Sequence, residues 1–261
     1  MKSLIRVGIL AGGLGTRLSE ETDTKPKPMV AIDGNPILWH LMNIFAAQDC
    51  NDFAIALGYK GEVIKRWLVD LNHLSGDLYV EGVSKVFTKQ TNFAAEKWRI
   101  HAIDTGLSTQ TGGRVRHLLR RFPNERLLVT YGDGLANVDI SELVKFHIGH
   151  GKLATLTTVR PPARFGHLES KDGLVTRFGE KQQLDVGWIN GGFFVLEPSV
   201  MNYIDNDLEP FESGALARLV QDGELMAFEH QGFWQPMDTL RERDELSRLA
   251  KLPTPPWMNL G

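Results

Sequence analysis

Cysteine is almost absent from this chain of 261 residues: Cys50 is the only one, so no intrachain disulfide can form. A protein without disulfides fits the reducing cytoplasm. The thiol lies among acidic neighbours in the segment Gln48-Asp49-Cys50-Asn51-Asp52, and nearby negative charge raises the pKa of a thiol. We therefore expect Cys50 to be a structural residue and not a nucleophile.

Long apolar runs and an excess of positive charge are also missing. No stretch approaches the roughly 20 apolar residues that cross a bilayer, and Arg6 interrupts the short apolar run near the N-terminus, unlike a signal peptide. The formal net charge is −3, which provides no basic field for nucleic acid. These absences predict a cytoplasmic protein that binds neither nucleic acid nor a membrane.

The chain has instead the composition and order of an α/β protein. Hydrophobic residues make up 42% of it and charged residues 23%, as in an ordinary globular domain. Apolar runs predict strands, and helical periodicity predicts helices between them. The expected strands are 7–10, 52–57, 78–87, 98–104, 126–131, 153–159 and 225–230, and the expected helices are 37–47, 59–71, 111–121, 140–150 (N-cap Asp139), 199–203, 213–222 and 238–249. This order is typical of a βαβ sheet.

A glycine-rich turn follows the first strand, in Leu10-Ala11-Gly12-Gly13-Leu14-Gly15-Thr16-Arg17-Leu18. Glycine allows close backbone approach to a ligand, and successive N–H groups in such a turn suit phosphate oxygens. The spacing is neither that of a dinucleotide-binding fingerprint nor that of a P-loop. The turn predicts a nucleoside-triphosphate site, the alternative being a strand-to-helix bend without a ligand.

Basic residues follow this turn in Lys25-Pro26-Lys27-Pro28-Met29. The alternating prolines favour an extended backbone, in which positions 25 and 27 point the same way. We therefore expect both ammonium groups to reach one anionic site. The alternative is a solvated basic turn.

Two aspartates occupy positions that suit a metal site. Asp133 follows a buried strand in Thr130-Tyr131-Gly132-Asp133-Gly134, and Asp238 follows Phe233-Trp234-Gln235-Pro236-Met237. Mg²⁺ typically takes one or two carboxylates together with phosphate oxygens. Each aspartate has a simpler interpretation: Asp133 as a turn residue, and Asp238 as the N-cap of the last helix.

Two further segments have groups that suit a base or a sugar. Hydroxyls and open backbone in the segment 105–114 could contact the edge of a base, or simply cap the helix that follows. Glu180, Lys181 and Asn190, with Gly191, could bind sugar hydroxyls, or form a surface ion pair and a β-bulge.

Together these motifs resemble the sugar-1-phosphate nucleotidyltransferases from about residue 5 to about residue 245. The segments that carry the resemblance are L-A-G-G-L-G-T-R-L, K-P-K-P-M, T-Y-G-D-G, the Glu180–Lys181 pair, I-N-G-G-F-F-V and F-W-Q-P-M-D-T-L. The resemblance is to the members that join CTP to α-D-glucose 1-phosphate. It implies a Rossmann-like α/β fold with a mixed, mainly parallel sheet flanked by helices and a smaller β-rich insertion on the sugar side.

The resemblance also implies a single domain, roles for particular residues, and Mg²⁺ as cofactor. In it, 1–160 form the nucleotide-binding half, 161–245 the sugar- and metal-side half and 246–261 a tail. Lys27, Arg17 and Asp133 would be catalytic, and Asp133 and Asp238 would bind the metal. The nucleotide would contact Leu10, Ala11, Gly12, Gly13, Gly15, Thr16, Arg17, Thr105, Thr109, Thr111, Gly113, Arg114 and Gly132. The sugar would contact Tyr131, Gly166, Glu180, Lys181, Asn190 and Gly191.

Several alternatives stay open at this point. The nucleotide could be dTTP or UTP, and the sugar another hexose 1-phosphate, because Gln182 stands where the family usually has proline. A non-catalytic nucleotide-binding regulatory subunit is disfavoured, since Lys27, Asp133 and Asp238 are all present. The resemblance further implies a homo-oligomer that serves surface-polysaccharide synthesis, and the segment 72–97 or the Trp257-bearing tail could form its interface.

Overall fold

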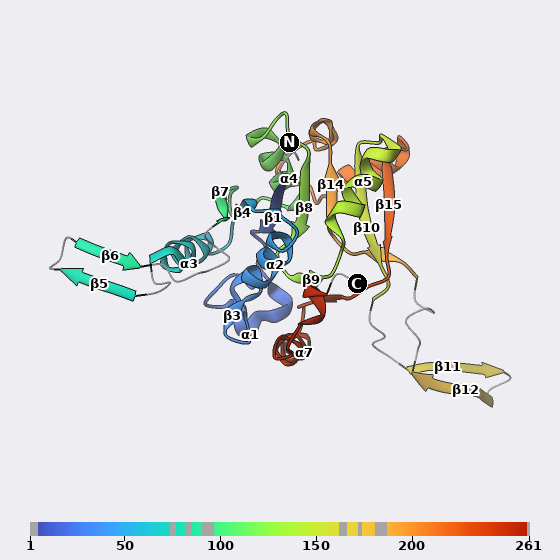
Figure 1. The fold of residues 1–261 in the computed structure, drawn as a ribbon. Coiled ribbons are helices and arrows are strands. Elements are labelled where there is room, and N and C mark those ends of the chain that lie inside the picture. The colour runs from blue at the N-terminus through green and yellow to red at the C-terminus, as the bar shows by residue number, and fades with distance from the viewer. Residues whose placement is uncertain are drawn as a thin grey trace.

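A mixed sheet forms the centre of the molecule (Figure 1). The computed structural model describes residues 5–73, 77–81, 85–89, 97–161, 166–171, 174–180 and 187–259. In these residues an eight-stranded sheet has the order β13-β10-β14-β8-β1-β4-β7, with β15 beside β10. The strands are β1 (Arg6–Ala11), β4 (Asp52–Leu57), β7 (Arg99–Asp104), β8 (Leu127–Tyr131), β10 (Ala154–Val159), β13 (Ile189–Asn190), β14 (Phe194–Leu196) and β15 (Leu225–His230).

Most neighbours in this sheet are parallel. Strand β1 runs parallel to both β4 and β8, β4 to β7, and β10 to β15. Strand β14 pairs antiparallel with β8 and β10, and β13 pairs antiparallel with β10. The prediction of a mixed, mainly parallel sheet is therefore confirmed. Every residue of β4 is buried, as expected of a parallel strand covered on both faces.

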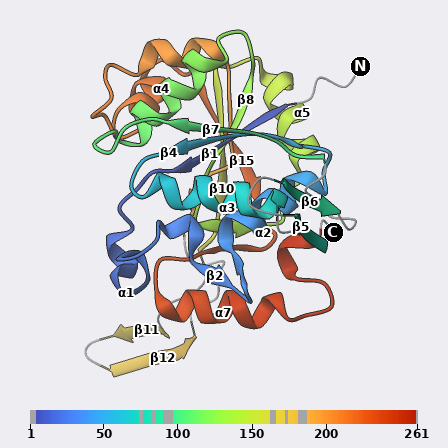
Figure 2. The ribbon, with the colours of Figure 1, turned by 90° about the vertical axis from the view of Figure 1, so that its left-hand side faces the viewer.

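Helices cover both faces of the sheet, as the edge-on view in Figure 2 shows. Alternate residues of β4 enter two cores: Phe53 and Ile55 lie in the core packed by α2 and α3, and Ala54 and Ala56 in the core packed by α4 and α6. The helices are α1 (Ser19–Thr22), α2 (Ile37–Ala46), α3 (Gly61–His73), α4 (Thr111–Arg121), α5 (Ile140–His150), α6 (Ala215–Gln221) and α7 (Leu240–Ala250), with 3₁₀ turns at Thr16–Leu18, Lys27–Met29, Pro198–Tyr203 and Pro256–Met258.

Most predicted elements agree with these bounds to within two residues. Helix α5 begins after Asp139, whose carboxylate accepts a hydrogen bond from Glu142 N at 2.9 Å, so the predicted N-cap is confirmed. The single strand expected at 78–87 is wrong. The chain forms two antiparallel strands there, β5 (Asp77–Glu81) and β6 (Lys85–Lys89).

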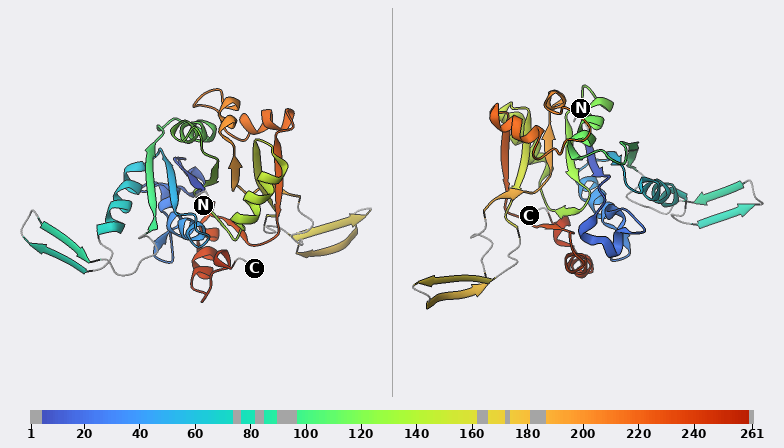
Figure 3. Two further views of the ribbon diagram at one scale, coloured as in Figure 1. Left: turned by 45° about the horizontal axis from the view of Figure 1, so that its top comes forward. Right: turned by 180° about the vertical axis from the view of Figure 1, so that it is seen from behind.

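In the part of the chain that the structure describes, four small sheets accompany the central one. Strands β2 (Ala31–Ile32) and β3 (Asn35–Pro36) form a short hairpin, and β11 (Gly166–Lys171) and β12 (Leu174–Glu180) form a longer one. The hairpins β5–β6 and β11–β12 extend from opposite sides of the body in Figure 3. The pair β9 (Gly134–Ala136) and β16 (Trp234–Pro236) joins distant parts of the chain. That pairing positions the site described below.

The C-terminal tail packs onto the domain. Trp257 is buried at 1% exposure and its ring contacts those of His40 and Phe233. Asn137 Nδ2 donates to the Asn259 carbonyl at 2.6 Å. The indole therefore completes the chain's own core, and an interface formed by the rest of the tail stays a prediction. None of the described helices is long and apolar enough to cross a membrane.

Candidate active site

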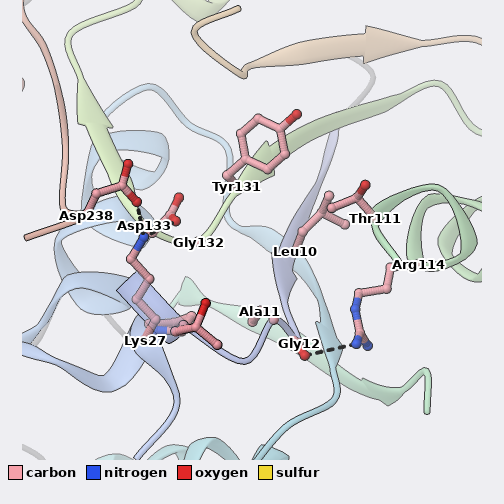
Figure 4. Close-up of a pocket in the computed structure, with 14 residues that line it drawn as sticks. Leu10, Ala11, Gly12, Lys27, Thr111, Arg114, Tyr131, Gly132, Asp133 and Asp238 are labelled. Atoms are coloured by element: carbon pink, nitrogen blue, oxygen red, sulfur yellow. Dashed lines mark hydrogen bonds and ion pairs between the residues drawn. The ribbon is translucent and has the colours of Figure 1, made fainter. Parts of the chain in front are cut away.

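The ends of two central strands form one cavity. Leu10 near the end of β1 pairs with Tyr131 at the end of β8, and Gly132 N donates to the Leu10 carbonyl at 3.1 Å. The cavity measures about 270 Å³ and lies where parallel sheets commonly bind ligands (Figure 4). We name it the strand-end cavity. It is lined by Leu10, Ala11, Gly12, Gly13, Gly15, Thr16, Lys27, Pro28, Thr111, Arg114, Tyr131, Gly132, Asp133 and Asp238.

An ammonium group lies between two carboxylates at one end of this cavity. Lys27 Nζ is 2.6 Å from Asp133 Oδ2 and 2.7 Å from Asp238 Oδ1. Lys27 is only 8% exposed. Burial lowers the pKa of Lys27, but the charges and hydrogen bonds of Asp133 and Asp238 outweigh it, and the net pKa is raised. The ammonium is therefore fully charged at neutral pH.

The pairing of β9 with β16 brings the two aspartates together. Gly134 pairs with Pro236, and Met237 N donates to the Asp133 carbonyl at 2.9 Å. Asp238 is not the N-cap of the last helix, so that alternative is wrong. Thr239 is the N-cap and forms a capping box with Glu242. The carboxylate of Asp238 points instead to Lys27 (Figure 4).

The second lysine of the motif lies elsewhere. Lys25 Nζ contacts Glu21 at 3.0 Å, four residues earlier in the chain. The expectation that Lys25 and Lys27 reach one anionic site is therefore wrong. Its premise fails because Lys27–Met29 forms a 3₁₀ turn with proline in its first turn, so the segment is not extended throughout.

Asp133 and Asp238 form a donor set that fits a divalent metal. Two carboxylates on separate element ends already hold one cation, the Lys27 ammonium, between them. Within the described residues there is no group of three or more His, Cys, Asp or Glu side chains that could hold a metal. A pair of carboxylates is what Mg²⁺ uses when phosphate oxygens complete its shell. The residues thus suit a metal bound together with a phosphate ligand.

The glycines of the turn have different physical roles. Gly15 has φ +67°, a left-handed conformation that favours glycine. A Cβ on Gly12 would lie 2.2 Å from Arg114 Cζ, whereas one on Gly13 would meet nothing within 4 Å. Arg17 belongs to the 3₁₀ turn Thr16–Leu18, and its side chain lies outside what the structure describes.

Arg114 connects the ends of three strands. It is 3% exposed and donates to the carbonyls of Gly12 at 2.9 Å, Leu57 at 2.9 Å and Gly106 at 3.1 Å, and to Thr105 Oγ1. Burial lowers its pKa, and Asp104 opposes that shift. The guanidinium therefore holds the glycine turn against the neighbouring strand ends.

Three of the predicted base contacts, Thr105, Thr109 and Gly113, are not among the residues that line the cavity. Thr105 Oγ1 donates to the Leu57 carbonyl at 2.6 Å, and Thr109 Oγ1 donates to the Thr105 carbonyl. Gly113 packs so closely that a Cβ there would lie 2.5 Å from the Asp207 carbonyl oxygen. Of the three threonines, Thr111 alone lines the strand-end cavity. A base-binding role for the other residues stays a prediction.

The predicted sugar residues fall into two groups. Tyr131 lines the cavity, and Asn190 Nδ2 donates to its hydroxyl at 3.2 Å. Gly191 follows directly, and its carbonyl accepts from Trp234 Nε1 at 2.9 Å. Gly166 and Glu180 face each other on the hairpin β11–β12, which extends away from the central sheet in Figure 1. Lys181 and Gln182 lie outside the described residues.

One residue beside the cavity was not predicted. Glu212 accepts hydrogen bonds from Tyr131 at 2.5 Å and from Thr111 at 2.8 Å. It lies in an irregular loop before α6, and no motif or periodicity in the sequence indicates it. Only the fold shows that this loop reaches the strand ends.

The cavity combines groups that suit two anions side by side. A buried ammonium, two carboxylates able to hold a cation, and a glycine turn are the parts that phosphoryl-type transfer requires. None of the described residues that line the cavity is a histidine, and none is needed when the attacking group is already an anion.

Comparisons with known proteins agree with this geometry. The family model for nucleotidyl transferase matches residues 7–241. The chain is 49% identical over 253 residues to glucose-1-phosphate cytidylyltransferase of Salmonella typhimurium, covering 95% of this chain and 97% of that protein. It is 40% identical to a Bacillus subtilis protein named probable glucose-1-phosphate cytidylyltransferase, covering 92% and 94%. A crystal structure of HddC from Yersinia pseudotuberculosis, complexed with GMP-PN, matches with a TM-score of 0.67 at 21% identity, covering 95% and 100%.

Proposed function

The chain belongs to the nucleotidyl transferase family, and within it we propose that this protein transfers the cytidylyl group of CTP to α-D-glucose 1-phosphate. The products are CDP-glucose and pyrophosphate. One observation carries the proposal: Lys27 lies between Asp133 and Asp238 at the strand ends of a cavity lined by the glycine turn. The 49% identity to a glucose-1-phosphate cytidylyltransferase over 95% of the chain supports the choice of substrates.

The proposed reaction leaves little covalent work to the protein. A phosphate oxygen of glucose 1-phosphate attacks the α-phosphorus of CTP, and the bond from that phosphorus to the β-phosphate oxygen breaks. The attacking phosphate is already an anion, so no general base has to remove a proton. The protein has to hold two anions that repel each other and to offset the charge that develops.

Each part of the cavity has a place in this scheme. The backbone of Gly12, Gly13 and Gly15, with the Thr16 hydroxyl, binds the phosphates of the nucleotide. Lys27 turns from the carboxylates to the attacking phosphate. The family resemblance assigns Arg17, whose side chain lies outside the described residues, to the leaving pyrophosphate. Asp133 and Asp238 would hold Mg²⁺, which would supply positive charge to the triphosphate.

The setting of the reaction belongs to the same proposal. We infer a cytoplasmic enzyme, since CTP is an intracellular nucleotide and the lone cysteine, Cys50, is a free and buried thiol. We also infer a homo-oligomer, which light scattering of the purified protein tests directly. CDP-glucose made in this way would feed the synthesis of a surface polysaccharide.

A substrate matrix tests the proposal. Purified protein with Mg²⁺ is incubated with each of CTP, UTP, dTTP and GTP against several hexose 1-phosphates, and released pyrophosphate is measured. We expect the highest kcat/KM with CTP and glucose 1-phosphate. Preference for UTP or dTTP would move the proposal to another pyrimidine nucleotide, and a second hexose 1-phosphate used better than glucose 1-phosphate would change the sugar. Binding of CTP without any turnover would favour a regulatory subunit.

A further inference from the structure

The carboxylate of Glu212 connects the two sides of the strand-end cavity. Its Oε2 accepts from the Thr111 hydroxyl at 2.8 Å, and its Oε1 accepts from the Tyr131 hydroxyl at 2.5 Å. Tyr131 in turn accepts from Asn190 Nδ2 at 3.2 Å. Thr111 begins α4 and Tyr131 ends β8. One side chain from a loop thus bridges two cavity-lining hydroxyls on different elements.

Backbone contacts fix the loop that carries Glu212. Gln110 N donates to the Asp207 carbonyl at 2.8 Å, and Gly112 N donates to the Glu209 carbonyl at 3.0 Å. A Cβ on Gly112 would lie 2.6 Å from that carbonyl oxygen, so glycine is what permits this approach. Phe211 is fully buried beside the Phe194 ring. The position of Glu212 is therefore set by the fold, although its side chain is at the surface.

These contacts determine the direction of the Thr111 hydroxyl. Phe211 N–H donates to Thr111 Oγ1 at 2.8 Å, which uses one lone pair of that oxygen. A carboxylate only accepts, so the contact with Glu212 uses the hydroxyl proton. One lone pair remains. Towards the strand-end cavity, Thr111 can therefore act only as a hydrogen-bond acceptor.

Thr111 lies at the end of the cavity that is away from the metal-binding carboxylates. Figure 4 shows Thr111 and Arg114 on one side of the cavity and Lys27, Asp133 and Asp238 on the other. A nucleotide whose phosphates approach Lys27 would extend its base towards Thr111. The hydrogen bonds of the Arg114 guanidinium go to Gly12, Leu57, Thr105 and Gly106. Thr111 is thus the hydroxyl placed to contact the base.

We propose that Glu212 sets the nucleotide preference of this enzyme by taking the hydroxyl proton of Thr111. An acceptor at that point favours a base that offers an amino group, as cytosine does, over uracil or thymine, which offer a carbonyl at the same ring position. Glu212 itself does not line the cavity, so it is a positioning residue. This inference rests on the proposed use of CTP.

The test of this proposal compares two substrates on the same protein sample, so a smaller fraction of folded protein lowers both rates equally and leaves their ratio unchanged. The ratio is kcat/KM for CTP divided by kcat/KM for UTP, with glucose 1-phosphate as the acceptor. In Glu212→Ala the Thr111 proton is free to turn to the cavity and to donate to a carbonyl. We expect the ratio to fall about tenfold, the size of one hydrogen bond. Thr111→Val removes the hydroxyl and should lower the ratio similarly.

A double variant separates this role from a general structural one. In the Thr111→Val background, Glu212→Ala should leave the ratio unchanged, because no hydroxyl remains to orient. The same tenfold fall in that background, or an unchanged ratio in Glu212→Ala alone, would overturn the proposal. Glu142→Ala is the matched control: Glu142 is an exposed glutamate on α5 that does not line the cavity, and the variant should behave as the wild type. If Glu212→Ala does not fold, Glu212→Leu serves, because leucine neither accepts nor donates a hydrogen bond, and the ratio should again fall.

Failure of the proposed function would give a different result. A wild-type protein that releases no pyrophosphate with any nucleotide would contradict the cytidylyl transfer itself. Calorimetric titration of CTP and of UTP would still decide the role of Glu212. The affinity ratio of the two nucleotides should fall in Glu212→Ala, and an unchanged affinity ratio would contradict the role.

Discussion

Lys27 and Asp238 lie 211 positions apart in the chain, yet the ammonium nitrogen of the one is 2.7 Å from a carboxylate oxygen of the other. Asp133 Oδ2 is 2.6 Å from the same nitrogen. The ammonium therefore lies between the two carboxylates, where a metal ion would bind. A divalent metal bound by these carboxylates would compete with Lys27 for them. Binding of the metal would therefore release the Lys27 ammonium, which could then contact a substrate phosphate.

Replacing Lys27 should separate metal binding from turnover. In Lys27→Met the competing ammonium is gone, so Mn²⁺, used as a probe for Mg²⁺, should bind about tenfold more tightly by electron paramagnetic resonance titration. Turnover should fall more than about a hundredfold, because a charge aimed at the attacking phosphate is lost. The protein should stay folded by circular dichroism. Weaker Mn²⁺ binding, or rates like those of the wild type, would contradict the role of Lys27.

Neutralising either aspartate should weaken the metal site. Asp133→Asn and Asp238→Asn keep the side-chain shape but remove a negative charge, so Mn²⁺ affinity should fall at least about tenfold. Asp139→Asn is a matched control, because Asp139 caps α5 and asparagine caps a helix equally well. The control should bind Mn²⁺ like the wild type. Equal affinity in all three variants would place the metal elsewhere.

The two adjacent glycines of the turn should differ in their effect on stability. In Gly12→Ala the new Cβ meets the Arg114 guanidinium, which four hydrogen bonds hold in place. We expect the free energy of unfolding in urea to fall by about 1–3 kcal/mol. Gly13→Ala adds a methyl group where nothing lies within 4 Å, and it should change stability by less than about 0.5 kcal/mol. A similar loss in both variants would refute the packing argument.

Stability should decrease in mild acid because of a buried histidine. His147 Nδ1 contacts Thr155 Oγ1 at 2.8 Å and Nε2 contacts Glu197 at 3.1 Å. Burial lowers the pKa of His147, although Glu197 opposes the shift. The unfolded chain therefore takes up a proton near the ordinary value of 6.5, while the folded chain does so only at lower pH.

Protons thus favour the unfolded state in that range, and stability is lost as the pH falls below about 6.5. The contribution from His147 between pH 7.5 and 5.5 should be about 1 kcal/mol, measured by urea unfolding at each pH. His147→Gln keeps a donor and an acceptor without titrating, so it should flatten part of the pH dependence. A wild-type protein that gains stability from pH 7.5 to 5.5 would contradict this account.

Local sequence patterns predicted the structure correctly where interactions between near neighbours in the chain determine it. The strand Asp52–Leu57 and the helix Ile140–His150 have the predicted bounds, since an unbroken apolar run and a capped amphipathic segment depend on near neighbours. Burial raises the pKa of Cys50 to about 11, with a further contribution from Asp49. The expected direction was correct, but the sequence gives only the smaller of those two causes.

Contacts between segments that are distant in the sequence could not be predicted from local patterns. Lys25 contacts Glu21 and Lys27 contacts the two aspartates, because the backbone changes to a 3₁₀ turn at Lys27. Thr105 is buried and accepts a hydrogen bond from Arg114, although its position in the motif predicts a contact with the base. Glu212 reaches Thr111 and Tyr131 because its loop packs against Gly112 at the start of α4, and no single segment of the sequence reveals that contact.

Labelled CTP tests the central claim most directly. The protein is incubated with glucose 1-phosphate, Mg²⁺ and CTP that carries ³²P at either the α or the γ position, and the products are separated by chromatography. Cytidylyl transfer predicts that the α label appears in CDP-glucose and the γ label in pyrophosphate. Transfer of the γ label to the sugar, or recovery of both labels as unchanged CTP, would contradict it.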